Sequence, residues 1–310
     1  MKKDLSNIKI AKKYLDKNEC IGIPTETVYG LAANAYSDKA THKIFNLKKR
    51  TKKNPLIVHY ENYKMLLGDC HINKDFLNLY KKFCPGPLTF VLKIRKNSSI
   101  SKNVTNNKNT LAVRFPKHPV TRILLKQLEF PIAAPSANIS SRVSAVTSND
   151  VKDDFGKRIK YILEGGRSNI GVESTIIDLI KKPKILRLGG LDVKTIQKIL
   201  RKRISLNVNT SKISAPGQFK IHYSPGIPIR LNVKKIKKDE AYLMIKKKKL
   251  NRPNYYFLSK KGSLREAAKN LYSTLRKIKK NKYKSIAVSK IPNRGLGKTI
   301  NDRLLRASKF

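Results

Sequence analysis

The sequence predicts an α/β protein with one large twisted sheet, followed by a smaller second α/β unit. Over residues 5–203, short apolar runs of strand length alternate with segments of helical period. Asparagines, prolines and glycines then interrupt the alternation, in a stretch that cannot hold a regular element. The 310 residues, 40% of them hydrophobic, suffice for two domains with ordinary cores. We therefore expect a first domain over residues 1–204, a linker over 205–228 and a second domain over 229–310.

Strand-like and helix-like patterns follow one another along both parts of the chain. An amphipathic helix is expected over Leu5 to Asp16, and further helical periods cover residues 38–49, 120–128 and 193–203. Strand-like runs cover residues 20–23, 56–59, 88–94, 111–115, 132–135, 161–163, 174–179 and 185–188. So many strands with intervening helices favour one twisted sheet. After the linker, strands are expected over 241–245, 255–258 and 286–288, with helices over 263–279 and 299–308.

One motif in the second unit imitates a phosphate-binding loop without completing it. Gly297-Lys298-Thr299 lies between a predicted strand and a predicted helix, but Pro292 occupies the position where the loop motif requires glycine. We interpret the tripeptide as the start of a helix.

Composition excludes several classes of protein. No apolar run approaches the about 18 residues that a membrane helix needs, and the first residues contain no apolar signal core, so we expect a cytoplasmic protein. Cys20, Cys70 and Cys84 are widely spaced and form no Cys-x-x-Cys pair, which argues against a disulfide framework and a structural zinc site.

The charge of the chain is strongly positive. Its 69 lysines and arginines against 20 acidic residues give a net charge of +49, which favours polyanions such as nucleotides and RNA as partners. Residues 231–310 contain 25 lysines and arginines and 4 acidic residues, so the charge is densest there. Lysine, isoleucine and asparagine are abundant throughout, however, and an AT-rich genome would produce the same composition without selection for binding.

A basic loop after the second predicted helix is the strongest candidate for phosphate binding. Lys48 and Arg50 end that helix, and Asn54 and His59 follow within a loop and a buried strand. Arginine offers a fork that matches phosphate oxygens, and lysine offers a compact charge. Earlier in the chain, the hydroxyl of Thr25 follows a strand that ends at Pro24, where loops usually bind substrates.

Other candidates lie at the ends of later strands. Ser136 and Asn138 follow a buried strand, where such side chains either cap a helix or bind a nucleotide. Arg114 lies within an apolar strand and requires an anionic partner, either a structural carboxylate or a substrate. Arg187 repeats this situation on a later strand, so the two arginines suggest an anionic ligand with several parts.

These motifs, taken in chain order, resemble the threonylcarbamoyl-AMP synthase family with its YrdC-like domain. They are Pro24-Thr25-Glu26-Thr27-Val28-Tyr29-Gly30, Lys48-x-Arg50 with Asn54-Pro55-Leu56-Ile57-Val58-His59, Pro85-Gly86-Pro87-Leu88-Thr89, Val113-Arg114-Phe115-Pro116 with His118-Pro119, Pro135-Ser136-Ala137-Asn138, and Glu173-Ser174-Thr175. The resemblance spans nearly all of residues 8–200. Longer family members add a linker, matched here by His222-Tyr223-Ser224-Pro225, and a small C-terminal domain, matched by Asn301-Asp302-Arg303-Leu304.

The resemblance implies a fold and a reaction. The fold is a twisted mixed sheet with a positively charged cavity, plus a small Rossmann-like α/β domain. The reaction is that of a nucleotidyltransferase: L-threonine, bicarbonate and ATP give threonylcarbamoyl-AMP and pyrophosphate, with Mg²⁺ arriving on ATP. The product supplies a downstream threonylcarbamoyl transferase complex that modifies tRNAs reading ANN codons. We also expect that the protein binds RNA directly.

The resemblance also implies roles for individual residues. Lys48 and Arg50 would be catalytic, and the ATP-binding set would be Lys48, Arg50, Asn54, Ser136, Asn138, Ser144, Arg187 and Tyr223. The threonine-binding set would be Thr25, His59, Arg114 and Ser174. Two departures affect loops rather than ligands: Thr51 replaces the proline usual after Lys-x-Arg, and Gln218 replaces a common methionine in the linker.

Two rival functions are compatible with parts of the sequence. Carbamoyltransferases and hydrogenase-maturation proteins contain the same domain, but with additional domains and often paired-cysteine zinc sites, which this sequence lacks. A non-catalytic RNA-binding protein would explain the charge of +49. Pyrophosphate release that requires threonine distinguishes synthesis from both rivals.

Overall fold

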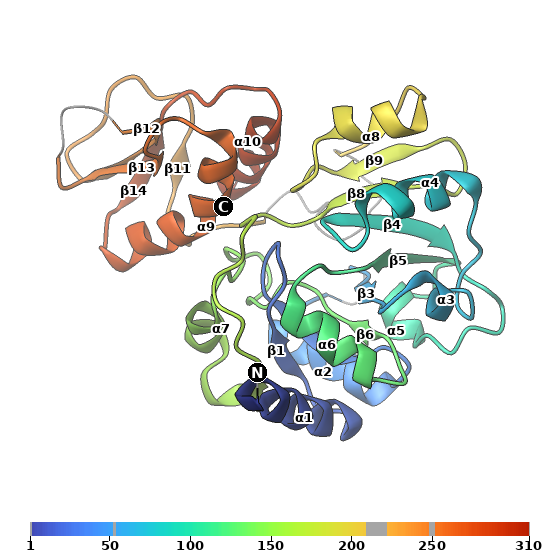
Figure 1. Ribbon diagram of the computed structural model, residues 1–310. Coiled ribbons are helices and arrows are strands. Elements are labelled where there is room, and N and C mark those ends of the chain that lie inside the picture. The colour runs from blue at the N-terminus through green and yellow to red at the C-terminus, as the bar shows by residue number, and fades with distance from the viewer. Residues whose placement is uncertain (1, 52–53, 209–221, 248–251, 310) are drawn as a thin grey trace.

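Two α/β domains, each with its own sheet, form the computed structural model of this chain (Figure 1). The structure describes residues 2–51, 54–208, 222–247 and 252–309, and in residues 2–4 the backbone alone. Figure 1 shows the small C-terminal domain beside the upper part of the large domain.

The larger sheet contains ten strands in the order β10-β9-β8-β4-β5-β3-β6-β2-β1-β7. It is mixed, as predicted, because β3 runs parallel to β5 whereas β4 runs antiparallel to it. The strands are β1 (Ile21–Ile23), β2 (Gly30–Asn34), β3 (Ile57–His59), β4 (Leu88–Lys93), β5 (Thr110–Arg114), β6 (Ile132–Ala133), β7 (Tyr161–Ile162), β8 (Thr175–Asp178), β9 (Lys184–Arg187) and β10 (Ser205–Leu206).

Helices cover this sheet and bury their apolar sides against it. In α4, for example, the Asn73 side chain caps the first turn, and Phe76 and Leu79 are buried in the core around Phe90. The helices are α1 (Lys2–Asp16), α2 (Asp38–Lys48), α3 (Tyr63–Leu66), α4 (Lys74–Phe83), α5 (Lys102–Thr105), α6 (Pro119–Gln127), α7 (Ser148–Phe155), the 3₁₀ turn η1 (Gly156–Arg158) and α8 (Val193–Leu200).

The smaller domain has a four-stranded parallel sheet in the order β11-β14-β12-β13. Its elements are β11 (Ile229–Arg230), β12 (Glu240–Lys246), β13 (Tyr255–Ser259), α9 (Leu264–Lys280), β14 (Ser285–Val288) and α10 (Leu296–Ala307). Ser263 caps α9, and a buried row including Leu271 and Leu275 faces the sheet. The strongly amphipathic pattern of α9 made this helix predictable from sequence.

The sequence prediction and the structure differ at a few elements. Strand β2 was missed because Gly-Leu-Ala-Ala-Asn contains no β-branched or aromatic residue, the types typical of strands. Helices α4 and α7 were also missed, although Thr147 and Asp150 form a capping box at the start of α7. Strand β10 lies inside the predicted linker and pairs with β9, whereas residues 209–221 of that linker lie outside the described residues.

The last helix begins earlier than expected, at Leu296, so Gly297-Lys298-Thr299 lies in its first turn. The tripeptide is therefore part of a helix start, as predicted from the failed loop motif. Within the described ranges, none of the helices is both long and apolar enough to cross a membrane.

Candidate active site

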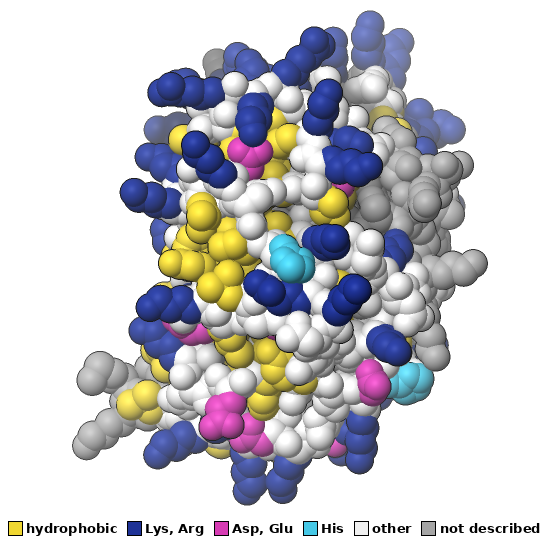
Figure 2. All heavy atoms as spheres, turned by 90° about the vertical axis from the view of Figure 1, so that its right-hand side faces the viewer, with side chains coloured by type: hydrophobic (Ala, Val, Ile, Leu, Met, Phe, Trp, Pro, Cys, Tyr) yellow, Lys and Arg dark blue, Asp and Glu magenta, His cyan; other side chains and the backbone are white. Residues whose placement is uncertain are grey.

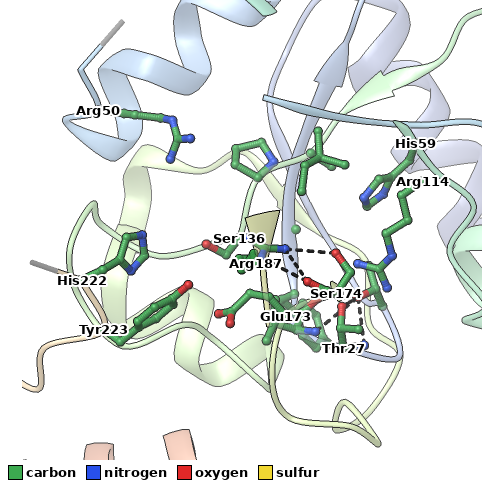
Figure 3. A pocket seen from close by; sticks show the side chains of 17 residues that line it. Thr27, Arg50, His59, Arg114, Ser136, Glu173, Ser174, Arg187, His222 and Tyr223 are labelled. Atoms are coloured by element: carbon green, nitrogen blue, oxygen red, sulfur yellow. Dashed lines mark hydrogen bonds between the residues drawn. The ribbon is translucent and has the colours of Figure 1, made fainter. Parts of the chain in front are cut away.

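A cavity lies where the ends of several strands of the large sheet meet the residues that lead into the small domain (Figure 3). Eight of the twelve predicted site residues line it: Thr25, Arg50, His59, Arg114, Ser136, Ser174, Arg187 and Tyr223. Figure 3 shows Arg50 and His222 on one side of the cavity and His59 and Arg114 on the other. The cavity thus brings together residues separated by almost 200 positions in the chain.

The turn after β1 places hydroxyl groups at the cavity. Thr25 donates to the carbonyl of Val28 at 2.6 Å and accepts from the backbone N–H groups of Thr27 and Val28 at 3.2 and 3.3 Å. The hydroxyls of Thr25 and Thr27 are 2.9 Å apart. Such side-chain bonds to nearby backbone hold a turn in one conformation. Thr27, which was not part of the predicted threonine-binding set, lines the cavity with Thr25.

Arg114 and His59 are neighbours because β5 and β3 pair in parallel with these two residues in register. Arg114 forms a buried ion pair with Glu26 at 2.7 Å, with the two side chains 5% and 10% exposed. Its Nε also donates to the carbonyl of Gly86 at 3.3 Å. Of the two partners that the sequence left open for Arg114, the structure shows the structural carboxylate. Its predicted contact with the threonine carboxylate stays a prediction.

His59 is neutral at physiological pH in this setting. Burial, and then the charge of Arg114, lower the pKa of His59 well below its ordinary value. Its Nδ1 has no hydrogen-bond partner among the described residues. A neutral imidazole at the cavity wall can therefore donate or accept one hydrogen bond to a ligand.

Arg187 and Ser174 form one rigid unit at the start of β8 and the end of β9. The guanidinium donates to the carbonyl of Ser174 at 3.1 Å from Nε and 2.9 Å from Nη2, and Nη2 also donates to the Ser174 hydroxyl at 3.0 Å. That hydroxyl lies 2.7 Å from the hydroxyl of Thr89 on β4. Burial lowers the pKa of Arg187. The cation is thereby fixed at the cavity in one orientation.

Arg50 reaches the cavity because α2 ends just before it. Lys49 adopts a left-handed conformation that terminates the helix, and Arg50 then donates to the carbonyls of Asn54 and Pro55 at 3.1 and 2.9 Å. Burial, and then the charge of Arg187, lower the pKa of Arg50 to about 9, which leaves it protonated at neutral pH. Arg50 and Arg187 thus present two cations to the same cavity.

Lys48 lies behind the cavity wall. It is 1% exposed and donates to the backbone carbonyls of Ser136 and Asn138, at 2.5 Å in each case. Burial, and then Arg50, lower the pKa of Lys48. In this structure Lys48 holds the loop that presents Ser136 to the cavity, and it is not among the side chains that line the cavity. Its contact with phosphates stays a prediction.

Three other predicted residues also lie behind the cavity wall. The amide nitrogen of Asn138 donates to the carbonyls of Ile139 and Arg142 at 2.8 and 2.9 Å. The Oδ1 atoms of Asn138 and Asn54 are buried without a hydrogen-bond partner among the described residues. Ser144 donates to Glu173 at 2.6 Å. The structure therefore gives these side chains structural contacts around the cavity, and their predicted contacts with ATP stay untested.

Glu173 is a cavity residue that the prediction missed. It belongs to the quoted Glu-Ser-Thr motif, but only Ser174 was assigned a role. Its carboxylate accepts hydrogen bonds from Ser144 and Tyr272 and forms a buried ion pair with Arg303 at 2.9 Å. Burial raises the pKa of Glu173, but Arg303, Arg187 and Ser144 together outweigh burial and lower it to about 2. The carboxylate therefore stays charged.

His222 and Tyr223 close one side of the cavity from the linker. Their rings are 4.0 Å apart, and Tyr223 stacks on Tyr272 of α9 at 5.8 Å with an interplanar angle of 17°. Burial lowers the pKa of His222 to about 3, so its imidazole is neutral. Tyr223, which the resemblance assigned to the ATP-binding set, lines the cavity.

The charges at the cavity are mixed. Arg50, Arg114 and Arg187 line it together with Glu173, and Arg114 is paired with Glu26. A net positive cavity stays a prediction. In the described part of the chain, no group of three or more histidine, cysteine, aspartate or glutamate side chains could hold a metal ion.

Comparisons with known proteins agree with this geometry. A family profile described as telomere recombination matches residues 13–189, and one described as threonylcarbamoyl-AMP synthase, C-terminal domain, matches residues 191–309. The chain is 34% identical to the threonylcarbamoyl-AMP synthase of Pyrococcus abyssi, over 98% of this chain and 94% of that protein. It is 33% identical to the Bacillus subtilis enzyme of the same name, over 96% and 92%.

A solved structure resembles the whole chain. The crystal structure of P. abyssi Sua5 complexed with L-threonine matches with a TM-score of 0.89 and 32% identity, covering 97% of this chain and 94% of that one. The two family profiles, the near-complete alignment with both relatives and the shared two-domain structure lead to one conclusion. The chain belongs to the threonylcarbamoyl-AMP synthase family.

Proposed function

We propose that this protein is an L-threonylcarbamoyladenylate synthase that converts L-threonine, bicarbonate and ATP into threonylcarbamoyl-AMP, pyrophosphate and water. The observation that carries this proposal is identity of 34% over 98% of the chain to a protein of that name, together with a structural match over both domains to a relative bound to L-threonine. In class it is a nucleotidyltransferase, because the adenylyl group of ATP is transferred.

The chemistry requires the cavity to position reactants and to offset negative charge. Bicarbonate and the threonine amine form a carbamate, one oxygen of which attacks the α-phosphorus of ATP while pyrophosphate leaves. Such a step depends mainly on alignment and on cations near the developing charge. The arginines Arg50 and Arg187, held by backbone carbonyls, suit the phosphates.

The opposite side of the cavity suits a small amino acid. Thr25, His59 and Arg114 line it with a hydroxyl, a neutral imidazole and a guanidinium, and the hydroxyl of Ser174, bonded to Arg187, lies between the two sides. These groups match the hydroxyl and carboxylate of threonine. ATP would then occupy the side with Arg50, Ser136, Arg187 and Tyr223. This arrangement would bring the carbamate and the α-phosphate together between the two sides.

Magnesium would enter with the nucleotide rather than occupy a dedicated site. Mg²⁺ in nucleotide sites is usually bound by phosphate oxygens, waters and few protein groups. Glu173, the carboxylate that lines the cavity, already accepts hydrogen bonds or ion pairs from three side chains. The hydroxyl of Ser136, a residue that lines the cavity, would be the protein group for such a contact.

The same proposal extends to the use of the product. Threonylcarbamoyl-AMP is an activated acyl adenylate and would supply a transferase complex that modifies tRNA, which also favours a cytoplasmic location. Direct RNA binding is a separate proposal that rests on the charge of +49 and on the lysine and arginine side chains spread over the face shown in Figure 2.

Pyrophosphate release in the presence of ATP and Mg²⁺ tests the proposed synthesis. We expect release only when L-threonine and bicarbonate are both present. L-serine, which lacks the methyl group, and L-2-aminobutyrate, which lacks the hydroxyl, serve as substrate controls. Release that is independent of threonine, or no release beside tight binding of RNA, would contradict the proposal.

A further inference from the structure

A buried arginine of the small domain reaches the wall of the cavity in the large domain. Arg303 lies on α10, and its side chain is 0% exposed. Its Nε binds Glu173 at 2.9 Å, and its Nη2 donates at 2.6 Å to the carbonyl of Leu188, next to the cavity residue Arg187. Its guanidinium carbon also lies 4.6 Å from the ring centre of Tyr223. One guanidinium thus contacts two side chains that line the cavity.

Both carboxylate oxygens of Glu173 are held by side chains of the protein. One oxygen accepts from Ser144 at 2.6 Å, the other accepts from Arg303 at 2.9 Å, and the hydroxyl of Tyr272 lies 3.0 and 2.9 Å from the two oxygens, which share its one proton. Three donors thus occupy most of the about four acceptor positions of the carboxylate. Glu173 therefore contributes mainly its charge to the cavity wall.

Without the charge of Arg303, the carboxylate of Glu173 would oppose the binding of a nucleotide. ATP with Mg²⁺ carries a net negative charge, whereas threonine at neutral pH carries none. A carboxylate in a poorly solvated wall acts over several ångströms because little water screens it. Arg303 is the cation in ion-pair contact with Glu173 among the described residues, and its Nη1 also pairs with Asp302, which Arg306 binds as well. The charge of Arg303 therefore matters more for ATP than for threonine.

We propose that Arg303 is a positioning residue for the reaction: it neutralises Glu173 and holds Tyr223, so that the phosphates of ATP can occupy the cavity beside Arg187. The inference rests on the proposed function, in which ATP binds in this cavity. It gives the small domain a direct role in nucleotide binding, and it goes beyond the family motifs, which assign no role to Glu173 or Arg303.

The alternative is that Arg303 only holds the two domains together. Arg276 on α9 provides the matched control, because it also bridges the domains. It binds Asp154 of α7 at 2.8 Å and donates to the carbonyl of Val143 at 2.7 Å, and neither partner lines the cavity. If only the contact between the domains matters, substitutions at Arg303 and Arg276 should weaken ATP binding to a similar extent. If the neutralisation of Glu173 matters, only the substitution at Arg303 should weaken ATP binding.

The test is a double-mutant cycle of Arg303→Met and Glu173→Gln, with Arg276→Met as the control. The KM for ATP, the KM for threonine and the dissociation constant of ATP with Mg²⁺ are measured for each protein. We expect Arg303→Met to raise the KM and the dissociation constant for ATP by about tenfold or more, and the KM for threonine by less than about threefold. In the background of Glu173→Gln, the same substitution should change ATP binding by less than about threefold.

Three results would overturn the proposal. The first is an equal rise of the KM for ATP and the KM for threonine in Arg303→Met. The second is a rise of the KM for ATP in Arg276→Met that equals the rise in Arg303→Met. The third is a loss that persists undiminished when Glu173 is replaced by Gln. Arg303→Lys serves if Arg303→Met does not fold. It retains the cation but loses the planar fork and the contact with the Tyr223 ring, so the KM for ATP should rise more than the KM for threonine, and equal rises in the folded protein would count against the proposal.

The outcome can be separated from that of the proposed function. If the wild-type protein releases no pyrophosphate with threonine, the proposed reaction is wrong. The dissociation constants for ATP still decide whether Arg303 neutralises Glu173.

Discussion

Replacement of Arg114 by alanine offers a detailed test of the threonine side of the cavity. The guanidinium is at the cavity wall, in register with His59 and paired with Glu26 at 2.7 Å. A hydrogen bond to a charged group contributes about 1.5–3 kcal/mol, which corresponds to about 10- to 150-fold in an equilibrium constant. We therefore expect kcat/KM for threonine to fall by about 10- to 150-fold, with a change in the KM for ATP of less than about threefold.

The same substitution also removes half of a buried ion pair. Loss of one partner of such a pair costs about 3–5 kcal/mol of stability because the other charge stays buried. Glu26 would keep one hydrogen bond, from the backbone N–H of Lys117 at 3.0 Å. We expect a lower Tm for Arg114→Ala and a partly restored Tm for the double substitution Arg114→Met with Glu26→Gln. The double substitution separates the stability effect from the loss of the cation.

Arg122→Ala is the matched control for these measurements. Arg122 pairs with Glu61 at 2.6 Å, with side chains 21% and 18% exposed, and neither residue lines the cavity. Its loss should lower stability slightly and leave both KM values unchanged. Equal losses for threonine and ATP in Arg114→Ala, or an equal loss in Arg122→Ala, would refute the assigned role.

Three further predictions concern other groups of the site. Lys48→Met should lower Tm and also reduce turnover, because the loop that carries Ser136 loses two hydrogen bonds; unchanged turnover in steady-state kinetics would show that Lys48 is dispensable. The pKa of Glu173 is about 2 in the folded protein and near 4.5 when the group is exposed. Its ionised form therefore contributes about 3 kcal/mol to the free energy of unfolding above about pH 4.5, and this contribution is lost as the pH falls toward 2. Unfolding free energies between pH 5 and 3 should therefore decrease less steeply for Glu173→Gln than for the wild type, and parallel slopes would contradict the assigned ion pair. Tyr223→Phe should keep the ring stacked on Tyr272 and hence retain most ATP affinity, whereas Tyr223→Ala should weaken it several-fold in equilibrium binding; equal effects would show that the ring is not what matters.

The sequence allowed most of the fold to be predicted because its strands have strong local patterns. Runs such as residues 56–59 and 111–115 are apolar and bounded by turn residues, and both form strands near the expected positions. Strand β2 had no such pattern, because glycine and alanine favour no strand by themselves. Its place is determined instead by pairing with β1 and β6, which lie far apart in sequence.

The cavity was predictable in outline and not in its contacts. The resemblance assigned Ser136 and Ser174 to the ATP-binding and threonine-binding sets, and both line the one cavity. The carbonyl partners of Lys48 and the link between Glu173 and Arg303 depend on loops and on the placement of a second domain. The residues of that link are 130 positions apart, a separation at which local patterns carry no information.

The central claim is that one cavity joins threonine, bicarbonate and ATP into an acyl adenylate. Mass spectrometry of a reaction that contains ¹³C-labelled bicarbonate tests it most directly. The account predicts threonylcarbamoyl-AMP carrying one ¹³C atom, formed only when threonine is supplied. Conversion of ATP without a labelled, threonine-containing adenylate would contradict it.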